Sequence, residues 1–275
     1  MESRKPIRLA LLDMYDGQKN LGIGNIISLI EEHQDIAYKR FDVRSKCELP
    51  SLDYDIYVCS GGPGSPLEGD RIWDRAFYNL MDRLWIHNQR SDEKKYVYFI
   101  CHSFQMICHH LSLGSVVKRK SESFGVFPVH KTEAGKTDRL VSVLPDPFYV
   151  ADFRNWQFIQ PDLERIHAMG CKILALEKIR PHVRLERAVM AMRFSDEWVG
   201  TQFHAEADPT GMILHFTEED KKKKVIAEKG LEKYNQIISD VKNPDKLPLT
   251  HAHILPQWLS ESSKKVLSYK LMPTP

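Results

Sequence analysis

The stretch Tyr96-Val97-Tyr98-Phe99-Ile100-Cys101-His102-Ser103-Phe104-Gln105 decides the fold of this chain. Residues 96–100 are apolar and aromatic without alternation, which is typical of a strand covered on both faces. Residues 102–113 then follow helical spacing up to Gly114. Cys101 therefore falls on the sharp turn between a buried strand and a helix, the position used by nucleophile elbows.

Outward from this stretch, strands and helices alternate. Further strands are expected at residues 7–12, 37–43 and 55–59, and helices at 21–32 and 71–87. The second half predicts shorter strands at 116–118, 126–130, 156–159, 173–177, 188–194 and 198–203. We therefore expect an α/β fold: a doubly wound, mostly parallel sheet flanked by helices, with antiparallel additions.

The pattern changes again near Phe216. Residues 218–242 are rich in charge but keep apolar residues at helical spacing, and a further helix is expected at 257–269. The basic run Lys221–Lys224 is interpreted as a solvated helix face, with a basic docking patch as the alternative. The predicted organisation is one domain over residues 1–215 and a helical C-terminal extension, 216–275, packed on the same domain.

Composition excludes several classes of protein. The 275 residues carry 39 Lys and Arg against 37 Asp and Glu, a net charge of +2 that is too even for a binder of nucleic acid or membrane surfaces. No apolar run approaches the roughly 20 residues of a bilayer span. Five scattered cysteines fit reduced thiols. We expect a cytoplasmic protein without nucleic-acid or membrane partners.

Cys101 is the candidate nucleophile. First-turn amides and the helix dipole beside a sulfur at this turn favour the reactive thiolate. The alternative is a small buried core cysteine, which is what most cysteines after apolar strands are.

A second candidate segment, Gly200-Thr201-Gln202-Phe203-His204-Ala205-Glu206, ends the run 198–203. In an extended chain residues two apart share a face, so His204 and Glu206 are expected side by side. A carboxylate that orients an imidazole is the base half of a cysteine triad. Taken alone, a histidine at a strand end is usually structural.

The loop Ser60-Gly61-Gly62-Pro63-Gly64-Ser65-Pro66 also follows a predicted strand. Its glycines allow a close backbone approach, so its amides could stabilise an oxyanion. It lacks the lysine of a P-loop. The alternative is a tight turn without chemistry.

Together these segments resemble the class I glutamine amidotransferase family, in its stand-alone form similar to the glutaminase domain of GMP synthase. The matching pieces are SGGPGSP (60–66), ICHSFQ (100–105), ESFGVFPV (122–129) and GTQFHAEAD (200–208). They occur in the family's order, and the resemblance covers residues 7–214. It implies a flavodoxin-like amidotransferase fold.

The resemblance also implies roles for individual residues. Cys101 would be the nucleophile, His204 the general base and acid, and Glu206 the residue that orients the imidazole. The amides of Gly62 and His102 would form the oxyanion hole. Substrate-binding residues would be Gln105, which borders the glutamine pocket, and Phe124 and Gly125, which contact bound glutamine.

Three positions depart from the family pattern. Phe99 and Ser103 replace the usual glycines two residues before and after the cysteine, and Ala205 replaces the usual proline between histidine and glutamate. Small residues relieve crowding at the elbow, so the ring of Phe99 needs a space that accepts it.

The predicted activity is that of a Cys-His-Glu glutaminase that supplies ammonia to a separate synthetase, with GMP synthesis as the first candidate. No metal or organic cofactor is required by this chemistry. One alternative is a γ-glutamyl peptide hydrolase or transferase. Another is a non-catalytic family member with an altered elbow.

Other groups of residues give weaker evidence of a functional site. Cys108, His109 and His110 resemble metal ligands, but neighbours on a helix point in different directions. Asp152 and Trp156 could line the pocket mouth, although a core role is the simpler interpretation of the tryptophan.

Overall fold

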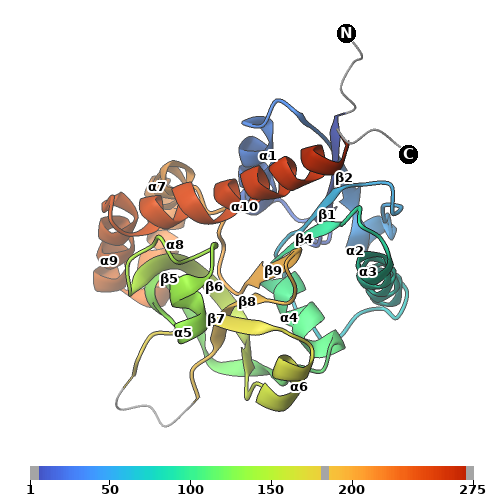
Figure 1. Cartoon of the computed structure of the whole chain (residues 1–275). Coiled ribbons are helices and arrows are strands. Elements are labelled where there is room, and N and C mark those ends of the chain that lie inside the picture. The colour runs from blue at the N-terminus through green and yellow to red at the C-terminus, as the bar shows by residue number, and fades with distance from the viewer. Residues whose placement is uncertain (1–5, 181–185, 271–275) are drawn as a thin grey trace.

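A computed structural model describes residues 6–180 and 186–270. Within these ranges the strands form one nine-stranded sheet, in the order β2-β1-β3-β4-β9-β8-β7-β5-β6 (Figure 1). The strands are β1 (Ile7–Asp13), β2 (Ile36–Asp42), β3 (Ile56–Cys59), β4 (Tyr96–Ile100), β5 (Ser115–Lys131), β6 (Phe148–Ile159), β7 (Lys172–Glu177), β8 (Val189–Arg193) and β9 (Trp198–Thr201).

The helices connect or cover these strands. They are α1 (Leu21–Glu31), α2 (Val43–Lys46), α3 (Trp73–Arg90), α4 (His102–His110), α5 (Glu133–Thr137), α6 (Leu163–Ala168), α7 (Pro209–Thr217), α8 (Glu219–Lys229), α9 (Leu231–Lys242) and α10 (Leu247–Lys270). Among the helices described, none has both the length and the apolar character needed to cross a membrane.

The sheet is mixed. β2, β1, β3, β4 and β9 pair in parallel, whereas the neighbours from β9 to β6 pair antiparallel. The expected α/β sheet with antiparallel additions is confirmed, with a larger antiparallel share than a mostly parallel sheet implies. β4 lies between β3 and β9 in the interior of the sheet, so Cys101 is carried to the edge where these parallel strands end.

Two apolar layers enclose the sheet. Helices α1 and α10 cover one face, where Ile26, Ile30, Leu255 and Leu259 are buried against β1 and β4. Helices α3 and α4 cover the other face with residues such as Phe77. The buried side chains of β4 belong alternately to the two layers, which explains its unbroken apolar sequence.

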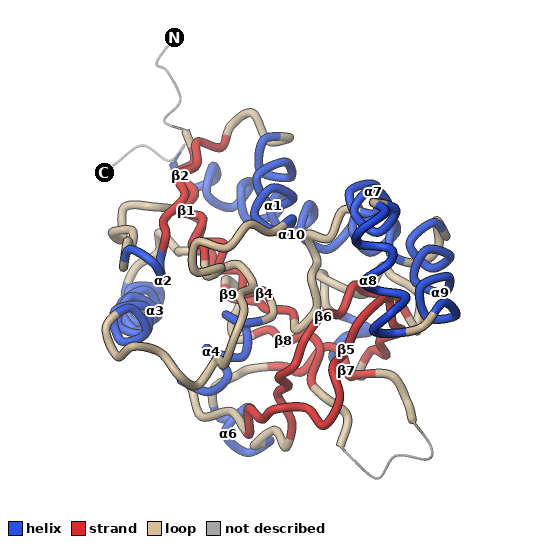
Figure 2. Tube along the Cα trace, turned by 180° about the vertical axis from the view of Figure 1, so that it is seen from behind, coloured by secondary structure: helices blue, strands red, loops and turns tan. Residues whose placement is uncertain are grey.

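A third apolar cluster joins the β5–β6 ribbon to α7, α8 and α9. Figure 2 shows these helices gathered beside the ribbon, away from α3. The extension expected from residue 216 is thus helical, and its last helix crosses the sheet to reach α1 (Figure 1).

Several element boundaries differ from the sequence expectations. The strands expected at 116–118 and 126–130 form the single strand β5, which continues through an irregularity between Lys118 and Ser123. The strand expected at 156–159 begins at Phe148. β5 and β6 pair mainly with each other. Their pairing extends beyond the short apolar runs into polar stretches, where the sequence pattern does not indicate a strand.

The helical region is also divided differently. The helix expected over 218–242 is two helices, because Gly230 adopts φ +87° and breaks it. The helix expected at 257–269 begins at Leu247 and contains Pro256. α7 has no counterpart among the expected helices, although Asp208 caps the amides of Thr210 and Gly211, with Pro209 at its first turn.

Candidate active site

Cys101 occupies a strained turn between β4 and α4. Its backbone has φ +47° and ψ −94°, a conformation that residues with side chains rarely adopt. Its amide donates to the carbonyl of Thr201 in β9 (2.8 Å), and its carbonyl accepts from Gln105 in α4 (3.0 Å). The sheet and the helix hold this residue from both sides, which is how a fold maintains such a turn.

Ser103 stabilises the elbow at a position where the family usually has glycine. Its hydroxyl lies 2.9 Å from the amide of Ile100, which donates to it, and 2.8 Å from the carbonyl of Cys59, to which it donates. The side chain is fully buried. Serine therefore links the end of β3 to the turn after β4, a contact that glycine lacks.

Phe99 points away from the thiol. Its ring packs against Phe194 and Trp198, with centroids 5.8 and 5.5 Å away. The residue beside it on β9 is Gly200, where an added Cβ would lie 3.1 Å from the Cβ of Phe99 and 2.7 Å from the ring of Phe104. The space for the phenylalanine is thus provided by a glycine on the neighbouring strand.

His204 and Glu206 meet as the sequence suggested, but for a different reason. β9 ends at Thr201, and the two residues lie in a turn in which the amide of Ala207 donates to the carbonyl of His204 (3.2 Å). His204 Nδ1 is 2.8 Å from Glu206 Oε1. The expectation of an extended segment was wrong, because the turn and not strand alternation places both side chains together.

The electrostatics of this pair favour the charged imidazole. Burial disfavours that form, but the negative charges of Glu206 and Cys101 outweigh it and raise the pKa of His204 well above its ordinary value. The Cys101 thiol is thus close enough to the ring to contribute to this shift in pKa. Cys101, His204 and Glu206 therefore lie within one interacting group.

Tyr15, which sequence reasoning missed, belongs to the same group. An added Cβ on Gly61 would meet its hydroxyl at 3.2 Å and the His204 ring at 2.9 Å. On Gly22 it would meet that hydroxyl at 2.5 Å and Glu206 Oε1 at 3.1 Å. Burial and then the charges of Glu206 and Cys101 raise the pKa of the Tyr15 phenol, so it stays neutral.

Arg44 holds the glycine loop in place. One of its guanidinium nitrogens, Nη1, donates to the carbonyls of Pro63 (2.6 Å) and Met14 (3.2 Å), and the group lies over the ring of Trp73. Gly62 sits between these contacts, and a Cβ there would come 2.3 Å from the carbonyl oxygen of Met14. Only glycine fits where the loop crosses the end of β1.

His102 follows the thiol and is buried. Burial, with a smaller contribution from the charge of Arg44, lowers the pKa of its imidazole to about 3, so the ring is neutral. The His102 amide lies in the first turn of α4, where amides have no acceptor within the helix. Among the described residues, the Gly62 amide donates to no backbone carbonyl.

Gln105 and Gln202 connect the thiol to the β5–β6 ribbon. The amide nitrogen of Gln202 is 3.7 Å from the sulfur of Cys101. Gln105 donates to the side chain of Gln202 and to the carbonyl of Trp156, both at 3.0 Å. Gln105 is thus already engaged, and Gln202 is the glutamine in direct contact with the thiol.

Phe124 and Gly125 lie beside this group, on the ribbon. Phe124 packs against the ring of Phe153, which in turn lies 6.4 Å from the ring of His204. Gly125 has φ +134°, and the space above its Cα is bordered by Ile237 and Lys233 of α9. The C-terminal helices therefore cover the segment expected to contact glutamine.

Three residues of the site were not predicted, because no local sequence pattern marks them as functional. Tyr15, Arg44 and Gln202 carry ordinary side chains, and only Gln202 lies inside one of the motifs. The structure also explains the cluster at residues 108–110: Cys108 is buried, and His110 stacks on Tyr78 and contacts Asp82. In the described residues, no three His, Cys, Asp or Glu side chains converge as metal ligands would.

No protein-family profile matches the sequence, and no curated protein matches it significantly. Several solved structures, however, match the fold of this chain. A glutamine amidotransferase from Thermotoga maritima is 16% identical with a TM-score of 0.69, and the match covers 94% of this chain and 98% of that one.

Two further structures match over a smaller part of the chain. A putative GMP synthase subunit from Thermoplasma acidophilum is 21% identical (TM-score 0.52), and the glutaminase domain of Trypanosoma brucei CTPS, solved with bound acivicin, is 13% identical (TM-score 0.54). These matches cover 74% and 73% of this chain and 86% of each structure. The chain therefore has the class I glutamine amidotransferase-like fold.

Proposed function

We propose that this protein is a glutamine amidotransferase that releases ammonia from the side chain of glutamine. The observation that carries the proposal is the strained Cys101 turn next to the His204–Glu206 pair, at the edge of the sheet where β4 and β9 end. The arrangement supplies a nucleophile, a proton carrier and a carboxylate that orients it. The fold, which glutamine amidotransferases share, supports the same conclusion.

The reaction begins when the Cys101 thiolate attacks the carboxamide carbon of glutamine and forms a C–S bond. The amides of Gly62 and His102 stabilise the resulting oxyanion. The C–N bond breaks as protonated His204 gives its proton to the departing nitrogen, which leaves as ammonia. Neutral His204 then takes a proton from water, whose oxygen attacks the thioester. The C–S bond breaks, and glutamate and the thiolate are released.

The arrangement of the side chains supports this order of steps. Because Glu206 and Cys101 raise the pKa of His204, the ring is charged when ammonia must leave. Phe99 packs away from the thiol, which removes the main reason to expect a collapsed elbow. Arg44 and the crowded site at Gly62 hold the loop against the end of β1.

The ammonia acceptor belongs to a separate protein in this proposal. The loop SGGPGSP does not have the SGGxDS pattern of an ATP pyrophosphatase, and in this proposal the activating enzyme is supplied in trans. A synthetase of GMP synthase type is the first acceptor to test, given the similarity to a putative GMP synthase subunit. Purification of the protein with its partner, followed by an assay of amidation with glutamine, identifies it.

The glutaminase step is tested with Cys101→Ala. Glutamate release is expected to fall by roughly four orders of magnitude or more, because no other group replaces the nucleophile. Cys47→Ala, at an exposed thiol, is the matched control and should keep full turnover. Acivicin should label Cys101 in the unmodified chain. Retention of turnover by Cys101→Ala would overturn the mechanism, and faster turnover of γ-glutamyl dipeptides than of glutamine would favour a γ-glutamyl hydrolase.

A further inference from the structure

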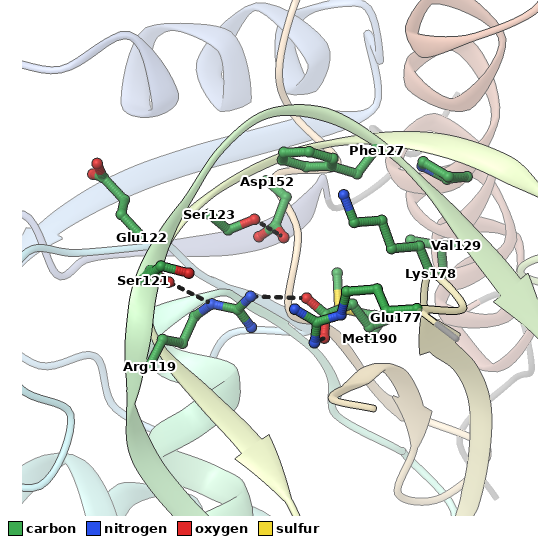
Figure 3. Close-up of a pocket in the computed structure, with 12 residues that line it drawn as sticks. Arg119, Ser121, Glu122, Ser123, Phe127, Val129, Asp152, Glu177, Lys178 and Met190 are labelled. Carbon is green, nitrogen blue, oxygen red and sulfur yellow. Dashed lines mark hydrogen bonds and ion pairs between the residues drawn. The ribbon is translucent and has the colours of Figure 1, made fainter. Parts of the chain in front are cut away.

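A cavity of about 140 Å³ lies between the β5–β6 ribbon and the ends of β7 and β8. Figure 3 shows Arg119 and Glu177 on one side of it and Phe127 with Lys178 on the other. Cys101 and His204 are not among the described residues that line it. The thiol and the imidazole therefore do not line this cavity, although it shares Asp152 and part of the segment 122–129 with the region expected to border the glutamine pocket.

The inner carboxylates of this cavity are already saturated with donors. Glu177 accepts from the guanidinium groups of Arg119 (3.0 Å), Arg154 (3.2 Å) and Arg180 (2.8 Å). Asp152 accepts from the same Arg154 (2.8 Å) and from the hydroxyl of Ser123 (2.6 Å). Three guanidinium groups face two carboxylates, so this wall carries one excess positive charge before any lysine is counted.

Two lysines increase that excess. The Lys178 ammonium lies 4.2 Å from the centre of the Phe127 ring, and the Lys233 ammonium of α9 lies 4.3 Å from the same ring. Among the described residues neither ammonium forms an ion pair. Burial lowers the pKa of each ammonium, and for Lys233 the charge of Lys178 lowers it further. The charge of Glu177 raises the pKa of Lys178, but less than burial lowers it. Asp240 has the same smaller effect on the pKa of Lys233.

Neighbouring acids do not cancel this charge. Glu122, at the rim, is paired with Lys229, and Asp240, near Lys233, is paired with Lys246. Two like charges near one ring, beside a wall with surplus guanidinium, repel each other less when an anion occupies the cavity next to Lys178. The structure therefore favours a negatively charged occupant.

We propose that this cavity is a binding site for a small anion of the phosphate or carboxylate class, held by Lys178 and Arg180 of its lining, while Lys233 adds positive charge beside the Phe127 ring without lining the cavity. Its volume is comparable to that of cavities that hold one benzene-sized molecule, so the occupant is small. The rings and methyl groups of Phe127, Val129 and Met190 line the same space and suit a short organic body attached to the anionic group.

Titration calorimetry on the full-length Cys101→Ala protein tests the proposal, because that variant cannot turn over glutamine. The probes are inorganic phosphate and malonate at low ionic strength, so that the two arms distinguish a phosphate site from a carboxylate site. Binding of at least one probe with one-to-one stoichiometry is the expected result. Failure of both probes to bind at millimolar concentration would overturn the proposal.

A matched pair of lysine variants tests whether the anion binds at Lys178. Lys178→Met keeps the side-chain length over Phe127 but removes the charge, and is expected to weaken binding by about tenfold or more. Lys221→Met, on the exposed face of α8, should bind like the parent. Equal weakening by both variants would show non-specific attraction and refute the site. Displacement of the bound anion by glutamine would instead make the cavity part of the substrate pocket, and would also contradict a separate site.

Discussion

At the scale of the residue, the His204–Glu206 pair shows how one carboxylate sets a protonation state. An imidazole as buried as this would normally lose its charge, yet Glu206 and Cys101 raise its pKa. A pKa that is raised on folding adds stability that is complete below the unfolded value of about 6.5. That contribution is lost as the pH rises through the folded value.

Glu206→Gln tests this electrostatic role. The amide keeps the size of the side chain but removes its charge, so the pKa of His204 is expected to fall toward its ordinary value. NMR titration of the labelled imidazole in both proteins measures the shift. Glutaminase turnover should fall less than in Cys101→Ala, since nucleophile and base remain. An unchanged pKa of His204 would show that Glu206 does not determine its protonation.

At the scale of the element, the loop between β3 and α3 is shaped by what it crosses. Gly61 lies against the His204 ring and Gly62 against the carbonyl of Met14, so neither position has room for a side chain. Arg44, from α2, ties the loop to the end of β1. The proposed oxyanion donors thus come from the loop after β3 and from the first turn of α4, which the parallel strands β3 and β4 bring to one edge.

Gly62→Ala tests the role of this loop. A Cβ 2.3 Å from a carbonyl oxygen forces the loop to move, and displacement of one oxyanion donor is expected to lower kcat by roughly 10²–10³. Gly24→Ala in α1 is the control, because an added Cβ there has no neighbour within 4 Å. Steady-state assays of glutamate release compare the two. Normal kcat in Gly62→Ala would exclude its amide from the oxyanion hole.

At the scale of the whole molecule, the C-terminal helices are part of the main core. Leu255, Leu259 and Val266 of α10 are fully buried against the same face of the sheet as α1. The α10 helix also ends beside the first strand, where Lys270 contacts Asp55 and the carbonyl of Pro6. Residues after 216 therefore contribute to the packing of the sheet.

Leu259→Ala measures this contribution. Removing a fully buried leucine side chain is expected to lower the free energy of unfolding by about 2–5 kcal/mol. Leu231→Ala, at a leucine 56% exposed in α9, should change it by no more than about 0.5 kcal/mol. Urea unfolding followed by tryptophan fluorescence compares the variants. A small effect of Leu259→Ala would mean that α10 is not needed for the stability of the sheet.

Several elements could be predicted from a few neighbouring residues alone. The buried strand 96–100 with its helix, the glycine loop at 60–66 and the adjacent His204 and Glu206 each appear within a few residues, so a pattern could find them. The continuity of β5 was not visible, because its middle residues are polar and it is stabilised by its partner strand. The glycine at position 230 was a sign that the helix breaks there. The apolar residues at helical spacing on both sides of it nevertheless favoured one continuous helix.

What the sequence by itself determined is the set of chemical groups and the α/β class, since hydrophobic runs and glycine turns follow from nearest neighbours along the chain. Only the tertiary structure decided which distant groups meet. Tyr15 and Gln202 reach the site around the thiol from loops, and Arg44 reaches it from α2. Gly200 makes room for Phe99 across the sheet. Such contacts depend on strand order and register, and these are set by the burial of the whole sheet between its two layers of helices.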